Sequence, residues 1–135
     1  MNFTTSSPAW SVGVTLLDCD HRTISEALFD LNEELSKGEN RRRIATLLRN
    51  FRRFNRNHFQ LEESMMAATK FPGLALHRLH HKWLVDQMAS LVADYTRGAR
   101  HLDQSSLGFL SQAHSIHVQK DDLDFGEWLN RSDLL

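Results

Sequence analysis

Imidazole and carboxylate side chains recur at a spacing of one helical turn in two neighbouring stretches of this 135-residue chain. His58 and Glu62 are four residues apart, and so are His77 and His81. Residues four apart lie on the same face of an α-helix, so each pair can offer two ligands to one metal ion. One such pair often arises by chance on a polar surface. Two pairs on consecutive helices, each on an apolar face, instead predict a metal site.

The helix that precedes these pairs is predicted from a 3-4 alternation of apolar residues. The alternation runs from Ile24 through Leu28 and Leu31 to Leu35, and His21 begins it, so we expect His21 to face inward. Asp18 or Asp20 is predicted to cap the start of this helix.

A second helix is expected over residues 41–68, with His58 and Glu62 in place of apolar residues on its buried stripe. Buried ionisable groups are costly unless they are paired or bind a metal, so their position is informative. The other members of the stripe are Ile44, Leu47, Leu48, Phe51, Phe54, Leu61 and Met65.

Two further helices follow a break at Phe71-Pro72-Gly73. The third is expected to end near Gly98, and the fourth to begin after an N-cap at Asp103. The inward stripe of the third is His77, His81, Leu84, Met88, Leu91 and Tyr95, and that of the fourth is Leu107, Leu110, His114, His117 and Asp121.

These patterns predict an all-α fold, an antiparallel up-down-up-down four-helix bundle with an extended N-terminal arm. We expect a single domain over residues 1–135, with the arm at 1–17, the bundle at 18–122 and a C-terminal tail or linker at 123–135. Thr4 to Pro8 is rich in turn-forming residues, and Trp10 is the first of several apolar anchors in the arm.

The composition excludes several classes of protein. The chain is 41% hydrophobic and 24% charged, with a formal net charge of −1, so we expect neither nucleic acid nor a membrane surface as a partner. The arginines of the second helix are expected to form a solvated face. Cys19 is the only cysteine, which predicts no disulfide framework and favours a reducing, cytoplasmic location. The N-terminus has the features of neither a signal peptide nor a membrane span.

Each predicted helix thus contributes inward polar groups, and this donor set suits metals such as iron. A ferritin-like di-iron site would need Glu-x-x-His on two helices, and that motif is missing from the sequence. Over residues 10 to about 125 the chain instead resembles the bacterial hemerythrins. The matching motifs are Trp10-x-x-Gly13, Asp18-x-x-His21, His58-Phe59-x-x-Glu62-Glu63-x-x-Met66, Phe71-Pro72, His77-x-x-x-His81 and His117-Val118-x-x-x-Asp122.

The resemblance implies a non-haem di-iron centre that binds dioxygen, and no catalytic residues in the domain itself. His77, His81 and His117 would hold one iron ion, and His21 and His58 the other. Glu62 and Asp122 would bridge the two ions together with an oxo or hydroxo group. The iron with only two histidines would keep an open position for dioxygen.

The resemblance and helix geometry disagree about the last carboxylate. Relative to His117, Asp121 is rotated by about 40° and Asp122 by about 140° around an ideal helix, which favours Asp121. The five-residue step of the family favours Asp122, which requires a wider helical turn or a helix end at this point. We expect Asp122 to be the bridging residue.

The oxygen pocket is expected to be lined by Ala113, His114 and Val118, where the related proteins carry bulkier groups at the first two positions. A roomier, wetter pocket with a titratable imidazole would allow fast autoxidation, unless His114 points to solvent. This departure favours an oxygen or redox sensor coupled to an output domain or signalling partner. The alternatives are an oxygen carrier or store, an enzyme that turns over peroxide or nitric oxide, and a metal-free interaction module.

Overall fold

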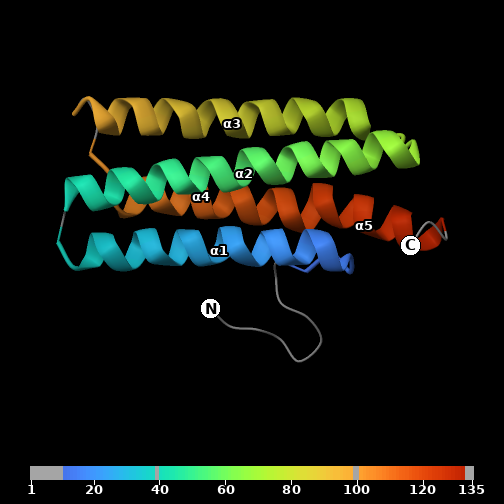
Figure 1. Ribbon diagram of the computed structural model, residues 1–135, viewed down its shortest axis with the longest axis horizontal. Coiled ribbons are helices and arrows are strands. Elements are labelled where there is room, and N and C mark those ends of the chain that lie inside the picture. The colour runs from blue at the N-terminus through green and yellow to red at the C-terminus, as the bar shows by residue number, and fades with distance from the viewer. Residues whose placement is uncertain (1–10, 39, 99–100, 133–135) are drawn as a thin grey trace.

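Four long helices lie side by side along the longest axis of the molecule (Figure 1). This computed structural model describes residues 11–38, 40–98 and 101–132, and in these ranges helix is the only regular secondary structure. The elements are α1 (Thr15–Ser36), α2 (Arg41–Thr69), α3 (Leu74–Thr96), α4 (Gln104–Ile116), a π-helical segment η1 (His117–Asp122) and α5 (Leu123–Arg131). The predicted all-α antiparallel four-helix bundle is confirmed. None of the described helices is long and apolar enough to cross a membrane.

The helix starts confirm one predicted cap and contradict another. The Asp103 side chain accepts a hydrogen bond from Ser106 N and caps α4 as predicted. By contrast, α1 begins at Thr15, before either predicted cap. Asp18 instead accepts hydrogen bonds from the Val12 backbone N–H at 2.6 Å and from the Ser11 hydroxyl at 2.8 Å. Its carboxylate therefore attaches the N-terminal arm to α1 rather than capping the helix.

The C-terminal segment continues the fourth helix and packs on the bundle. Phe125 and Leu129 of α5 are 0% and 1% exposed. The arm passes so close to α5 that a Cβ atom on Gly126 would lie 2.4 Å from the Val12 carbonyl oxygen. Of the predicted N-terminal arm, Thr4 to Pro8 and Trp10 lie outside the described residues.

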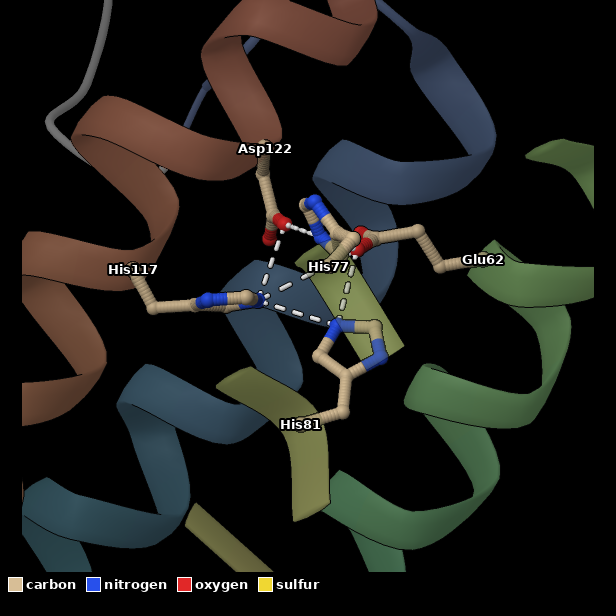
Figure 2. A group of neighbouring side chains, drawn as sticks. All are labelled: Glu62, His77, His81, His117 and Asp122. Atoms are coloured by element: carbon tan, nitrogen blue, oxygen red, sulfur yellow. Dashed lines mark hydrogen bonds and ion pairs between the residues drawn. The ribbon is translucent and has the colours of Figure 1, made fainter. Parts of the chain in front are cut away.

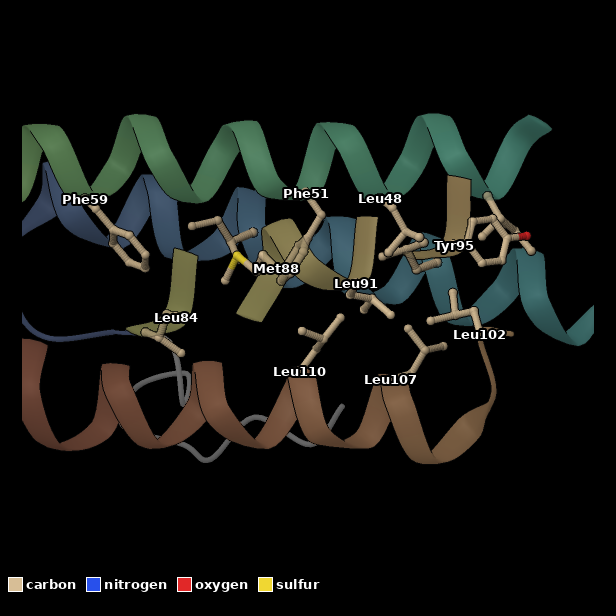
Figure 3. Close-up of a cluster of buried hydrophobic side chains, with 13 residues drawn as sticks. Leu48, Phe51, Phe59, Leu84, Met88, Leu91, Tyr95, Leu102, Leu107 and Leu110 are labelled. Atoms are coloured by element: carbon tan, nitrogen blue, oxygen red, sulfur yellow. The ribbon is translucent and has the colours of Figure 1, made fainter. Parts of the chain in front are cut away.

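Two separate apolar clusters flank a polar layer in the bundle. The larger cluster runs from Ile24, Phe59 and Leu84 to the far end of the helices, as Figure 3 shows for Leu48, Leu91 and Tyr95. The smaller one joins the arm, α1, α2, η1 and α5 through Val12, Val14, Leu17, Met66, Val118, Phe125 and Leu129. His21 lies between the two clusters in the sequence of α1, and Glu62 lies between them in the sequence of α2, so apolar side chains cover the polar layer from both directions.

The buried stripe of α2 differs slightly from the prediction. Met66 is fully buried and Met65 only partly, because the long helix keeps its 3.6-residue period past Glu62. Asn55 is also buried, and its side-chain amide donates to the Phe51 carbonyl oxygen at 2.8 Å.

Candidate metal centre

All seven predicted ligand side chains converge between the helices, and none is more than 4% exposed. They come from four elements: His21 from α1, His58 and Glu62 from α2, His77 and His81 from α3, and His117 and Asp122 from η1. Figure 2 shows five of them pointing toward one another. Their ligand atoms form two groups that could each hold a metal ion, and both groups contain Glu62 and Asp122.

The first group contains three imidazoles. His117 Nε2 lies 3.1 Å from His81 Nε2 and 3.0 Å from Asp122 Oδ1. His77 Nε2 lies 2.9 Å from Asp122 Oδ1 and also contacts Glu62 Oε1. His81 Nε2 is 3.1 Å from the same Glu62 oxygen. Three imidazole nitrogens and two carboxylate oxygens therefore surround one position.

The second group contains two imidazoles and uses the other oxygen of each carboxylate. His21 Nε2 lies 2.8 Å from Asp122 Oδ2 and 3.0 Å from His58 Nε2. His58 Nε2 lies 3.2 Å from Glu62 Oε2. Each carboxylate thus presents Oε1 or Oδ1 to the first group and Oε2 or Oδ2 to the second, as a ligand that bridges two metal ions must.

These distances fit metal coordination better than a hydrogen-bond network. Ligands at right angles around an ion, each about 2.1 Å from it, lie about 3.0 Å apart. Two N–H groups cannot point at each other at 3.0 Å, so at least one of His21 Nε2 and His58 Nε2 must present a lone pair, as a metal ligand does. Glu62 Oε2 is buried, and its 3.2 Å contact with His58 Nε2 lacks the geometry of a hydrogen bond, so no described residue satisfies this oxygen. The donor set therefore fits a pair of cations.

Asp122 reaches the centre because the helix widens between His117 and Asp122. Residues His117–Asp122 form a π-helix, whose hydrogen bonds span five residues instead of four. The wider turn brings Asp122 onto the face of His117, so it is 0% exposed and contacts both groups. Asp121 lies outside the ligand layer, where its Oδ2 is 3.1 Å from His117 Nδ1.

Three carboxylates outside the ligand layer hold imidazoles in place, and the sequence analysis missed this role for each of them. Asp121 contacts His117 Nδ1, as described above. In the same way, Asp20 Oδ2 lies 3.0 Å from His58 Nδ1, and Glu63 Oε2 lies 2.7 Å from His81 Nδ1. An Nδ1–H that donates to a carboxylate leaves Nε2 as the metal-binding nitrogen and makes it more basic. All three carboxylates stand next to predicted ligands in the sequence, but adjacency alone does not reveal such a contact.

Electrostatics within the centre favour charged carboxylates and protonated imidazoles. Burial alone would lower the pKa of His58, but the neighbouring carboxylates of Asp122, Asp20 and Glu62 outweigh it and raise that pKa to about 11. The same competition raises the pKa of His77 to about 9 and that of His117 to about 10. Despite burial, the surrounding imidazoles hold the pKa of Asp122 well below its usual range. Metal binding must displace the protons from these imidazoles.

The three predicted pocket residues do not lie together. His114 and Val118 line a cavity between α1 and α4, and the His114 ring centroid is 6.4 Å from that of His21. Ala113 lies in a different groove, between α3 and α4, beside His117. His114 is only 8% exposed, so it does not point to solvent. Burial and the charge of His21 lower its pKa to about 3, so this imidazole is neutral rather than titratable near pH 7.

The remaining histidines and the cysteine have simpler surroundings. His80 is partly exposed, and its Nδ1 lies 2.8 Å from the Asp121 carboxylate that also holds His117. His101 is exposed in the segment before α4, and Cys19 is a free, exposed thiol.

Comparisons with known proteins agree with this geometry. Residues 12–129 match the sequence model of the family described as "Hemerythrin HHE cation binding domain". A crystal structure of wild-type hemerythrin superimposes with a TM-score of 0.85 at 25% identity, over 94% of this chain and 95% of that one. Crystal structures of two leucine variants of hemerythrin superimpose equally well. No curated protein gives a significant match. The chain belongs to the hemerythrin family, and its cluster of histidines and carboxylates is able to hold metal ions.

Proposed function

We propose that this domain holds two iron ions and binds dioxygen reversibly. The observation that carries the proposal is the pair of donor groups that share both oxygens of Glu62 and Asp122. His77, His81 and His117 are assigned to one iron ion, and His21 and His58 to the other. Two ferrous ions held in this way supply the electrons that dioxygen binding requires.

The protein's own residues prepare the centre for this chemistry. The outer carboxylates orient the imidazoles through their Nδ1 atoms, which limits rotation of these rings when a small molecule enters. The two-histidine group contains four donor residues, whereas the other group contains five. The ion held by the two-histidine group would therefore have more room for an external ligand. Two carboxylates partly neutralise the charge of the buried cations.

We further propose that the domain is an oxygen or redox sensor whose state is read by an output domain or a signalling partner in the cytoplasm. His114 supports this role because it places a neutral, hydrogen-bonding imidazole beside His21, at the end of a cavity with several hydroxyl groups. Water drawn into this region would shorten the life of the oxygenated form. A carrier or store needs a drier pocket. Turnover of peroxide or nitric oxide at the same irons is the enzymatic alternative.

Visible absorption spectroscopy tests both parts of the proposal. The purified protein is loaded with iron, reduced with dithionite and followed after air is admitted. We expect an oxygen-dependent band that forms and then decays within minutes, and that lasts longer in a His114→Leu variant. A band that persists for hours in the unaltered protein would support the carrier instead. If no iron-dependent spectrum appears, the di-iron assignment is wrong.

A further inference from the structure

A cavity of about 500 Å³ runs between α1 and α4. Its size falls within the range of small-molecule sites, roughly 300–1,000 Å³. One side is lined by a stripe of α1 and the other by a stripe of α4, and the space exists because several facing residues are small. A Cβ atom on Gly108 would meet nothing within 4 Å. The other small residues of the lining are Ser25, Ser111 and Ser115.

His114, which lines this cavity, carries a buried hydrogen-bonding atom that the described residues leave unused. His114 lines the cavity and is 8% exposed, and its Nε2 has no partner among the described residues. A buried polar atom without a hydrogen bond costs about 1–3 kcal/mol, so a ligand that supplies the bond gains a corresponding advantage. Nε2 is a donor in one tautomer of neutral imidazole and an acceptor in the other. A hydroxyl group can pair with either.

The rest of the lining sets the charge and shape of the occupant. Apart from the neutral imidazole of His114, no ionisable side chain lines the cavity among the residues that the structure describes. A charged molecule would lose its hydration without gaining an ion pair there. Apolar side chains from both helices provide surface for a flat ring, and 60% of Phe29 is exposed and available to be covered. These apolar residues are Leu28, Phe29, Leu107 and Val118.

We propose that the cavity between α1 and α4 binds a small neutral aromatic alcohol, with its ring between the two helices and its hydroxyl group on His114 Nε2. Phenol and hydroquinone are the simplest members of this class. The site is separate from the metal ligands, and its occupation requires no reaction at iron. A bound ring would also exclude water from the side of the centre that contains His21.

Isothermal titration calorimetry of the metal-loaded protein tests this assignment with three probes of similar size. Phenol has the ring and the hydroxyl group, toluene lacks the hydroxyl group, and benzoate carries a charge. We expect one phenol per chain, bound about five- to tenfold more tightly than toluene because of the hydrogen bond to His114. Benzoate should bind more weakly than phenol. Equal or tighter binding of benzoate, or no binding of phenol, would overturn the proposal.

Two variants and two matched controls locate the site. His114→Leu removes the hydrogen bond but keeps an apolar side chain, so phenol should bind no better than toluene. Gly108→Leu fills the cavity, so neither probe should bind. His101→Leu makes the same change as His114→Leu outside the cavity lining, and Ser105→Leu places a leucine on the same helix outside it, so both variants should bind phenol like the unaltered protein. Circular dichroism confirms that each variant is folded.

The location of bound phenol has two further readouts. Unchanged phenol affinity in the Gly108→Leu variant would contradict binding in this cavity. A new visible absorption band on adding phenol to the ferric protein would indicate a phenolate on iron, and that result would also overturn the assignment. We expect no such band.

Discussion

Asp121 and Asp122 are adjacent in the chain but contact the centre in different ways. Asp122 gives one oxygen to each donor group, whereas Asp121 accepts from the outward nitrogen of His117. We expect Asp122→Asn to lower the metal content to one ion per chain or fewer, because an amide offers only one good ligand oxygen. Asp121→Asn should retain two ions at neutral pH with roughly 10- to 100-fold weaker affinity. Elemental analysis after chelator challenge distinguishes the two, and identical metal content in both variants would contradict these roles.

The raised pKa values of the ligand imidazoles set the pH dependence of the metal-free protein. An unfolded histidine titrates near pH 6.5, but the pKa of His77 is about 9, that of His117 about 10 and that of His58 about 11. Groups whose pKa is raised by folding contribute stability that is full below pH 6.5 and is lost as pH rises through the folded values. The free energy of unfolding of the metal-free protein should therefore fall between pH 7 and pH 10.

Urea unfolding at both pH values measures this change, with metal-loaded protein as the control. The loaded protein should lose much less stability over the same interval, because its ligand imidazoles are already deprotonated by the metal. If the metal-free protein became more stable toward pH 10, these histidines would not be protonated in the folded chain.

At the scale of the elements, α5 and the arm hold the widened helix in place. Val12 and Phe125 belong to the same apolar cluster as Val118 of η1, and Gly126 lets the Val12 backbone approach α5 closely. We expect Gly126→Ala to destabilise the protein by about 1–3 kcal/mol, because the contact to be relieved involves backbone. Gly108→Ala, where nothing lies within 4 Å, should be neutral or stabilising by up to about 1 kcal/mol. Thermal unfolding measures both, and equal effects would contradict the close approach.

The elements also show how far the sequence alone leads. Amphipathic periodicity predicts the four helices and the inward direction of His21, His58, His77 and His81, because both depend on local spacing. The π-helix does not follow from spacing, and Asp122 was preferred only from the family resemblance. The contact between Asp20 and His58 joins residues 38 apart in the chain and depends on how the helices pack. Residues 123–131, expected as a tail or linker, are helical because an apolar face of α5 meets the arm.

For the whole molecule, the arrangement of two apolar clusters around one polar layer predicts an uneven response to metal removal. The larger cluster contacts the ligands through Phe59, which stacks on His81, and extends from there to Leu102, so we expect most of it to stay packed without metal. The smaller cluster contains Val118 and is joined to the rest of the bundle through the ligand layer. Two pairs of imidazole nitrogens in that layer lie close together: Nε2 of His21 and His58 at 3.0 Å, and Nε2 of His81 and His117 at 3.1 Å. Without cations, the lone pairs of these nitrogens repel each other unless the imidazoles take up protons. Metal removal should therefore loosen one end of the bundle and leave the other end intact.

Hydrogen exchange followed by mass spectrometry, before and after chelation, measures this response. We expect amide protection to fall in η1, α5 and the ligand-bearing turns of α1–α3, and to remain around Phe51 and Leu91 of the larger cluster. Helical circular dichroism should change little, while the melting temperature should drop by about 10 °C as the binding free energy is lost. A uniform loss of protection along the chain would mean that the metal centre stabilises the bundle as one cooperative unit. Protection lost only in η1, α5 and the ligand-bearing turns would support the uneven response that the two apolar clusters predict.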